Sequence, residues 1–180
     1  MRRLIFLSVL TITVCVANYG IAFDNHRQGF IIGGLGGVAY NILQYEHDGE
    51  DESYRGLGYQ IDLRIGGGTQ NNKFMFYSWV KINFSYPWLL YTGAIGLSYY
   101  LKPDAPSLYF NIGVGISGVA VPILMGPGVI AGIGYEFFPH MSFETGIYYV
   151  GPKIYEVLFN TGEYDFNSLA MSLSIVVIAY

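Results

Sequence analysis

Charge is scarce in this chain of 180 residues. Only 12% of the residues are Asp, Glu, Lys or Arg, about half of the ~25% found in typical soluble domains. A cytosolic globular protein is therefore not expected. The 9 basic and 13 acidic residues give a formal net charge of −4. This acidic balance argues against a nucleic-acid partner, which requires a basic surface.

Cysteine is almost absent. The single cysteine, Cys15, excludes a disulfide framework and a thiolate metal cluster. Its acylation as a lipoprotein is an alternative, although Val14 precedes it where a small residue is needed. The chain is instead rich in glycine (24), tyrosine (17) and phenylalanine (12), unlike a bundle of membrane-spanning helices. Low charge with this composition is typical of β-structure in a membrane.

The first seventeen residues have the layout of a secretory signal peptide. Arg2 and Arg3 precede an uncharged, mostly apolar run at 4–14, which is too short to cross a ~30 Å bilayer as a helix. We expect cleavage after Ala17, or alternatively after Ala22. Cleavage after Ala17 leaves 9 − 2 = 7 basic and 13 acidic residues, a net charge of −6.

The rest of the chain alternates between two kinds of side chain. From Leu108 to Ser117, one parity holds Leu, Phe, Ile, Val and Ile, and the other holds Tyr, Asn, Gly, Gly and Ser. Residues 55–66 repeat the pattern. Such a period of two predicts strands whose two faces meet different surroundings. The eight predicted strands lie approximately at 29–45, 54–68, 73–86, 89–101, 107–121, 128–138, 142–155 and 168–180.

The length of these segments suits a membrane. They have 11 to 17 residues, whereas the commonest soluble strand has ~5–6 and a tilted membrane strand needs ~9–11 to cross the hydrocarbon. An open sheet in lipid would leave edge N–H and C=O groups unpaired. The predicted fold is therefore all-β, a closed antiparallel eight-stranded transmembrane β-barrel of up-and-down meander order. It occupies 18–180 as one domain and follows a cleaved signal peptide at 1–17.

The parity of each residue predicts its face. The bulky apolar set is expected to face lipid, and the small and polar set the narrow lumen. Five charged residues share the lumen parity: Asp62, Arg64, Lys81, Glu136 and Glu144. On the lipid side an Arg or Lys would cost ~2–4 kcal/mol at the midplane. We expect them to pair inside as a structural salt-bridge and hydrogen-bond network, with a lumenal proton or ion path as the alternative.

Turn chemistry separates the strands. With the amino terminus starting in the periplasm, the turns at 69–72, 102–106 and 139–141 are predicted to be periplasmic. The outward connections are then 46–53, 86–88, 121–127 and 156–167. The first of these holds five carboxylates: Glu46, Asp48, Glu50, Asp51 and Glu52. We expect a solvated acidic loop, with weak binding of Ca²⁺ or Mg²⁺ as the alternative, because hard cations prefer oxygen ligands.

One segment indicates a family. Gly134-Tyr-Glu-Phe-Phe-Pro-His-Met-Ser-Phe-Glu-Thr-Gly146 resembles the strand–tight turn–strand unit of the small eight-stranded outer-membrane proteins, the OmpA-barrel, OmpX and opacity-like group. The aromatic Tyr180 is similar to their terminal signal for the barrel-assembly machinery, although Ser172 and Ser174 depart from it. The resemblance implies a Gram-negative outer membrane, with its lipid, lipopolysaccharide and assembly machinery as partners. It leaves the activity open.

His140, Ser142 and Glu144 suggest a different chemistry. A barrel family that deacylates lipid A uses a histidine, a nearby serine and a glutamate, and a Ser–His pair suits acyl transfer. Pro139-His140 is however turn chemistry on the predicted periplasmic side, whereas lipid A lies in the outer leaflet. A lipid A-modifying enzyme is therefore the third functional interpretation.

The leading interpretation is a monomeric, non-enzymatic barrel with a structural or surface-interaction role and a plugged lumen, without metal or cofactor. The second is a narrow transport barrel for protons, small ions or a small apolar solute. Two other folds fit less well. A soluble lipocalin-like barrel would carry its charge outside, and a helical inner-membrane protein would not alternate at period two through the proline- and glycine-rich stretch 105–135.

Overall fold

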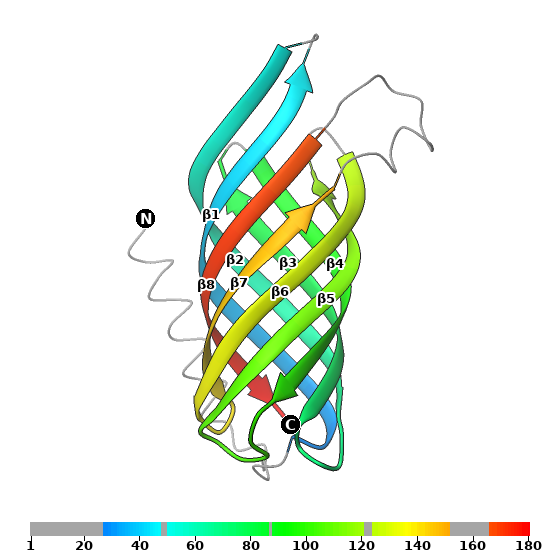
Figure 1. The fold of residues 1–180 in the computed structure, drawn as a ribbon, viewed down its shortest axis with the longest axis vertical. Coiled ribbons are helices and arrows are strands. Elements are labelled where there is room, and N and C mark those ends of the chain that lie inside the picture. The colour runs from blue at the N-terminus through cyan, green and yellow to red at the C-terminus, as the bar shows by residue number, and fades with distance from the viewer. Residues whose placement is uncertain (1–26, 48–49, 87, 121–123, 152–165) are drawn as a thin grey trace.

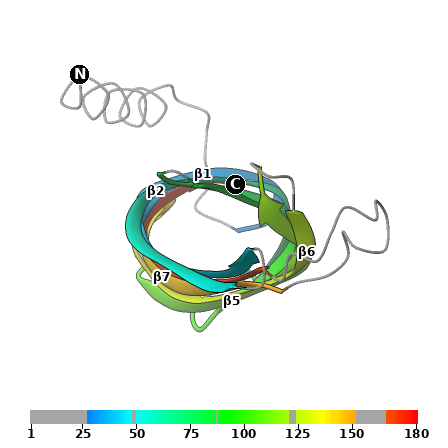
Figure 2. The same cartoon turned by 90° about the horizontal axis from the view of Figure 1, so that it is seen from above.

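The computed structural model describes residues 27–47, 50–86, 88–120, 124–151 and 166–180. They form eight antiparallel strands, each paired with its neighbours in chain order, and β8 pairs with β1 to close the barrel (Figure 1). Seen along its axis, the barrel is a ring of strands (Figure 2). This confirms the predicted all-β, closed, up-and-down meander. The strands are β1 (Gly29–His47), β2 (Glu50–Gly68), β3 (Phe74–Ser85), β4 (Trp88–Tyr100), β5 (Ser107–Val119), β6 (Leu124–Phe138), β7 (Met141–Val150) and β8 (Phe166–Ala179).

Side chains alternate across the wall of the barrel. In β3 every second residue from Met75 to Ser85 is buried, and the residues between them lie on the outer face. The middle of the outer face is aliphatic: Ile61, Leu63, Ile95, Ile112, Val114, Ile133, Ile147, Leu173 and Ile175 are all exposed. Exposed aromatic residues flank this belt toward both ends: Tyr40, Tyr59, Phe84 and Tyr149 at one, and Phe30, Tyr99, Phe110, Tyr135, Phe138 and Phe143 at the other. An apolar band between two aromatic girdles is the surface of a transmembrane barrel.

No helix among the described residues is long and apolar enough to cross a membrane.

The predicted strand boundaries differ most at the first outward connection. The segment 46–53 was expected to be a loop, but β1 continues to His47 and β2 begins at Glu50, with Tyr45 opposite Glu52. That prediction is wrong because charged residues were taken as a loop signal. Beyond the apolar belt a strand needs no apolar face, and backbone pairing between β1 and β2 maintains the ladder there.

The remaining differences are small. β6 begins at Leu124, inside the connection predicted at 121–127. The signal peptide predicted at 1–17 lies outside the described residues, as do residues 152–165, which include the end of the predicted seventh strand.

Candidate functional site in the barrel lumen

The structure places all five predicted lumenal charges on the inner face. Asp62 and Arg64 lie on β2, Lys81 on β3, Glu136 on β6 and Glu144 on β7. Each is at most 5% exposed. They do not form a single cluster. Four of them meet in one network, and Glu136 belongs to a second network at the end of the barrel that carries the short turns.

The first network joins four charges. Arg64 Nη2 donates a hydrogen bond to Glu144 Oε1 at 2.6 Å and lies 3.8 Å from Asp62 Oδ2. Lys81 Nζ lies 3.9 Å from the same Asp62 oxygen. Two carboxylates therefore meet two cations, and this group has no net charge. Buried ions persist in a protein only with such compensation.

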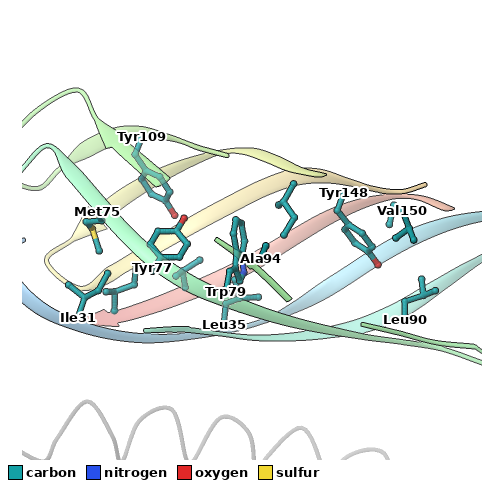
Figure 3. Close-up of a cluster of buried hydrophobic side chains, with 14 of the residues drawn as sticks. Ile31, Leu35, Met75, Tyr77, Trp79, Leu90, Ala94, Tyr109, Tyr148 and Val150 are labelled. Atoms are coloured by element: carbon teal, nitrogen blue, oxygen red, sulfur yellow. The ribbon is translucent and has the colours of Figure 1, made fainter. Parts of the chain in front are cut away.

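Aromatic side chains surround these ion pairs. Trp79 Nε1 donates to Asp62 Oδ2 at 2.8 Å, and the guanidinium carbon of Arg64 lies 4.2 Å from the centroid of the same indole ring. The hydroxyl of Tyr109 donates to Glu144 Oε2 at 3.0 Å. Figure 3 shows Trp79 and Tyr109 projecting into the barrel, from β3 and β5 respectively. The indole thus serves both as a donor to the carboxylate and as a face for the cation.

A glycine makes room for one of these rings. Gly134 on β6 lies opposite Tyr109 on β5, and a Cβ atom at this position would overlap the tyrosine ring. Tyr109 could therefore not reach Glu144 past a larger residue at position 134.

Glu136 is paired with a residue that the sequence did not place in the lumen. Arg27 lies just before β1, is 1% exposed and forms a salt bridge with Glu136. Alternation could not predict it, because Arg27 precedes the first strand. A charge count could have signalled it, since three inward carboxylates faced only two inward cations. With Arg27 included, the described residues place three acidic and three basic side chains inside the barrel.

Arg27, the first described residue, also contacts two turns. Its Nη1 donates to the backbone carbonyl oxygens of Asn72 at 3.1 Å, Lys102 at 3.0 Å and Pro103 at 2.6 Å. Its guanidinium carbon lies 3.9 Å from the centroid of the Tyr100 ring. The segment before β1 is therefore fixed to the β2–β3 and β4–β5 turns at one end of the barrel.

Glu136 receives further donors from the last residue and from the β6–β7 turn. The Tyr180 hydroxyl donates to Glu136 Oε1 at 2.6 Å, and the backbone N–H of His140 donates to the same oxygen at 3.3 Å. Burial and the Glu136 carboxylate raise the pKa of Tyr180, so its hydroxyl keeps the proton that it donates.

His140 and Ser142 form hydrogen bonds with different partners. His140 has a φ of 73° in the tight turn, and its Nδ1 lies 3.0 Å from the carbonyl oxygen of Ile178. Ser142 Oγ lies 3.0 Å from the Tyr109 hydroxyl. Acyl transfer requires the serine hydroxyl to be hydrogen-bonded to the histidine ring. Among the described hydrogen bonds, the histidine ring instead pairs with a backbone carbonyl at the turn, and the serine hydroxyl pairs with Tyr109 in the lumenal network.

Toward the opposite end, the lumen becomes neutral and then apolar. Asn83 Nδ2 donates to Asn41 Oδ1 at 2.6 Å, and the Tyr148 hydroxyl donates to the same oxygen at 3.1 Å. Beyond this triad lies a layer of buried apolar side chains: Leu43, Leu90, Val119, Val150 and Ala170. The described charged side chains of the lumen thus lie in the middle of the barrel and at the end that carries the short turns.

Of the predicted acidic loop, only part is described. Asp51 and Glu52 are exposed, and Glu52 accepts a hydrogen bond from the Tyr45 hydroxyl. Asp48 and the side chains of Glu46 and Glu50 lie outside the description. Within the described part of the chain, no group of three His, Cys, Asp or Glu residues is arranged to hold a metal ion. Weak cation binding here stays a prediction.

Comparison with known proteins finds likeness in structure rather than in sequence. No family model matches the chain, and no curated protein matches it. The crystal structure of Ail, the attachment invasion locus protein of Yersinia pestis, has a TM-score of 0.50 and 12% identity and covers 84% of this chain and 99% of its own. A structure of Ail with the heparin analogue sucrose octasulfate has a TM-score of 0.49 and 12% identity, over 84% and 99% of the two chains. Neisserial surface protein A has a TM-score of 0.48 and 16% identity, over 83% and 96%.

At such identities the likeness concerns the fold alone. It agrees with the closed ring of eight antiparallel strands and with the apolar outer belt. The chain thus has the fold of the small eight-stranded outer-membrane β-barrel proteins, the group that its sequence resembles.

Proposed function

We propose that the protein is a non-enzymatic outer-membrane barrel with a structural or surface-interaction role, whose lumen is plugged by the charged and polar network. It is exported by the signal peptide at 1–17, inserted by the barrel-assembly machinery and monomeric in outer-membrane lipid and lipopolysaccharide of the Gram-negative type. The end with the short turns then faces the periplasm, and the β1–β2 hairpin faces the outside.

The balance of charge inside the barrel carries this proposal. Each of the three inward carboxylates lies within salt-bridge distance of a cation: Asp62 of Arg64 and Lys81, Glu144 of Arg64, and Glu136 of Arg27. A charged conduit needs side chains that are available to a passing ion. Here the charged groups are engaged with one another, and aromatic rings pack against them, which supports a structural plug.

A narrow transport barrel is the second candidate, and one observation favours it. Side-chain polar atoms of Gln60, Ser85 and Asn111 are buried without a hydrogen-bond partner in the described part of the chain. Water would satisfy such groups, and a connected file of water would provide a path for protons or small ions.

Conductance across a planar bilayer decides between the two candidates. We expect the purified full chain to insert without opening channels at high salt. Its folded state is verified on a denaturing gel, where a closed barrel migrates differently before and after boiling. Stepwise currents from samples that show this gel shift would contradict the plugged lumen and support transport. Absence of both the shift and the outer-membrane location would contradict the membrane barrel itself.

A further inference from the structure

The mouth of the barrel opposite the short turns carries a carboxylate held beside an aromatic ring. The β1–β2 hairpin extends above the other strands there (Figure 1). Tyr45 of β1 lies directly opposite Glu52 of β2, and its hydroxyl donates a hydrogen bond to the Glu52 carboxylate. Leu43, two residues before Tyr45, is buried in the lumen, so Tyr45 and Glu52 lie on the inner face of the hairpin.

A second aromatic ring reaches this pair from across the mouth. The ring of Trp88, the first residue of β4, lies 5.3 Å from the ring of Tyr45, with the two planes at 59°. In the barrel, β2 and β3 separate β1 from β4. The contact therefore bridges the mouth rather than two adjacent strands. Rings tilted in this way leave face area uncovered, unlike two rings stacked in parallel.

A third ring stands on the same face of the hairpin. Tyr54 follows Glu52 by two residues, and its hydroxyl donates to the backbone carbonyl oxygen of Tyr86 at 2.5 Å. A Cβ atom at Gly56 would overlap the Tyr54 ring, so the glycine makes room for it. Three half-buried rings thus pack against the buried apolar cluster of the lumen and keep part of their surface accessible: Tyr45, Tyr54 and Trp88.

These four side chains lie in a region of water and negative charge. Glu52 is exposed and lies 59 − 52 = 7 residues beyond Tyr59, which marks the border of the apolar belt. Residues 43–55 contain five acidic residues and one basic residue, Arg55, a net charge of −5 + 1 = −4. A concave mouth with this charge concentrates cations from solution.

The chemistry of the four side chains selects the kind of cation. Trp and Tyr rings attract a cation placed over their faces, and Trp does so most strongly. Both tyrosine hydroxyls already donate, to Glu52 and to the Tyr86 carbonyl oxygen, so acceptor capacity is partly used. A metal ion needs several oxygen ligands, and a primary ammonium is strongly hydrated. A quaternary ammonium has no N–H to satisfy, and its methyl groups suit aromatic surfaces.

We propose that Tyr45, Glu52, Tyr54 and Trp88 form a binding site for a quaternary ammonium group at the outer mouth of the barrel. The recognised chemistry is a trimethylammonium group, carried either by a free choline-like solute or by a phosphocholine headgroup. The rings contact the methyl groups, and Glu52 supplies the compensating charge. This inference deepens the proposed surface-interaction role and rests on it, because the mouth must face the outside.

The two tryptophans of the chain provide a signal and an internal control. The test records the indole N–H resonances of the ¹⁵N-labelled full chain, folded in non-ionic detergent, during titration with choline chloride. We expect the Trp88 signal to shift and saturate. The Trp79 signal should stay in place, because this indole is buried in the lumen and donates to Asp62. Trp88→Phe assigns the two signals.

A neutral analogue separates cation recognition from simple apolar contact. Dimethylbutanol has the shape of choline, with a carbon atom in place of the charged nitrogen, and should not produce the shift. An unmoved Trp88 signal in choline, or an equal shift with dimethylbutanol, would overturn the proposal.

Two neighbouring carboxylates separate the site from general negative charge. Glu52→Gln should weaken choline binding at least about tenfold, because it removes the charge beside the rings. Asp51→Asn is the matched control: it removes the same charge from the adjacent exposed residue on the opposite face of β2. It should change binding by less than about twofold. Equal weakening by both variants would overturn the site. The gel shift on boiling verifies that each variant is folded.

A further titration identifies the source of the ammonium group. Glycerophosphocholine carries a phosphate next to the same trimethylammonium group. Binding as tight as that of choline would support the site and assign a lipid headgroup to it. Binding of choline alone would support the site and assign a free solute.

Orientation is measured separately on intact cells. Ser53→Cys, in a Cys15→Ala background, should react with a membrane-impermeant maleimide, because residue 53 is exposed beside the mouth. Labelling without choline binding would overturn the ligand site and leave the proposed function standing. No labelling, in cells whose barrel shows the gel shift, would overturn the surface role and this inference together.

Discussion

At the scale of single residues, Arg64 connects the two carboxylates of the first lumenal network. It is fully buried, donates to Glu144, lies near Asp62 and packs over the Trp79 ring. Removing one partner of a buried pair leaves an uncompensated charge, which typically costs about 3–5 kcal/mol. We expect Arg64→Met to lower the free energy of unfolding by about this amount, measured by urea titration in lipid vesicles with tryptophan fluorescence.

The double variant Arg64→Met/Glu144→Leu separates loss of the pair from loss of packing. It removes both charges, and buried pairs replaced by apolar residues are often neutral, so most of the lost stability should return. Lys102→Met, at an exposed turn position, is the control and should stay within about 0.5 kcal/mol of the wild type. Equal unfolding free energies for Arg64→Met and Lys102→Met would contradict the structural role of Arg64.

Sequence parity predicted the positions of single residues well, but not their partners. The inward positions of Asp62, Lys81 and Glu144 follow from alternation alone. That Arg64 on β2 reaches Glu144 on β7 does not, because β1 and β8 separate these strands in the ring and only the register fixes which side chains share a level. Arg27 was missed because it lies before the repeating pattern begins.

At the scale of strands, the two glycines Gly115 and Gly93 provide a matched pair. A Cβ atom at the inward Gly115 of β5 would overlap the Gly93 carbonyl group and approach Ala94 Cα at 2.5 Å, whereas a Cβ at the outward Gly93 of β4 meets nothing within 4 Å. Gly115→Ala should therefore cost about 1–3 kcal/mol through overpacking. Gly93→Ala should remain within about 0.5 kcal/mol of the wild type. Urea unfolding in vesicles measures both, and equal values would contradict this close strand approach.

The strands were predictable where their surroundings impose a pattern. Inside the apolar belt, lipid on one side and a narrow lumen on the other enforce alternation, and the predicted and observed bounds of β3, β4 and β5 agree within two residues. In β8 the run 175–178 still alternates, because Val176 and Ile178 are buried inside while Ile175 is exposed outside. Beyond the belt nothing enforces a pattern, so the continuation of β1 to His47 and the start of β2 at Glu50 could not be predicted from the residues.

At the scale of the whole molecule, the outer face of the barrel is expected to meet lipid along the apolar belt and water beyond it. The position of the bilayer along the barrel can be measured. On the outer face of β2, Leu57 lies beyond the aromatic border at Tyr59, whereas Leu63 lies within the aliphatic belt. An arginine on the lipid face costs about 2–4 kcal/mol at the bilayer midplane and about 0–1 near the interface. We therefore expect Leu63→Arg to be the more destabilising of the two by about 2 kcal/mol, measured by urea unfolding from vesicles. In detergent micelles, which adapt to the surface that they cover, this difference should shrink. Equal costs at positions 57 and 63 in vesicles would mean that the bilayer does not cover this belt, and the barrel would then have to be placed elsewhere.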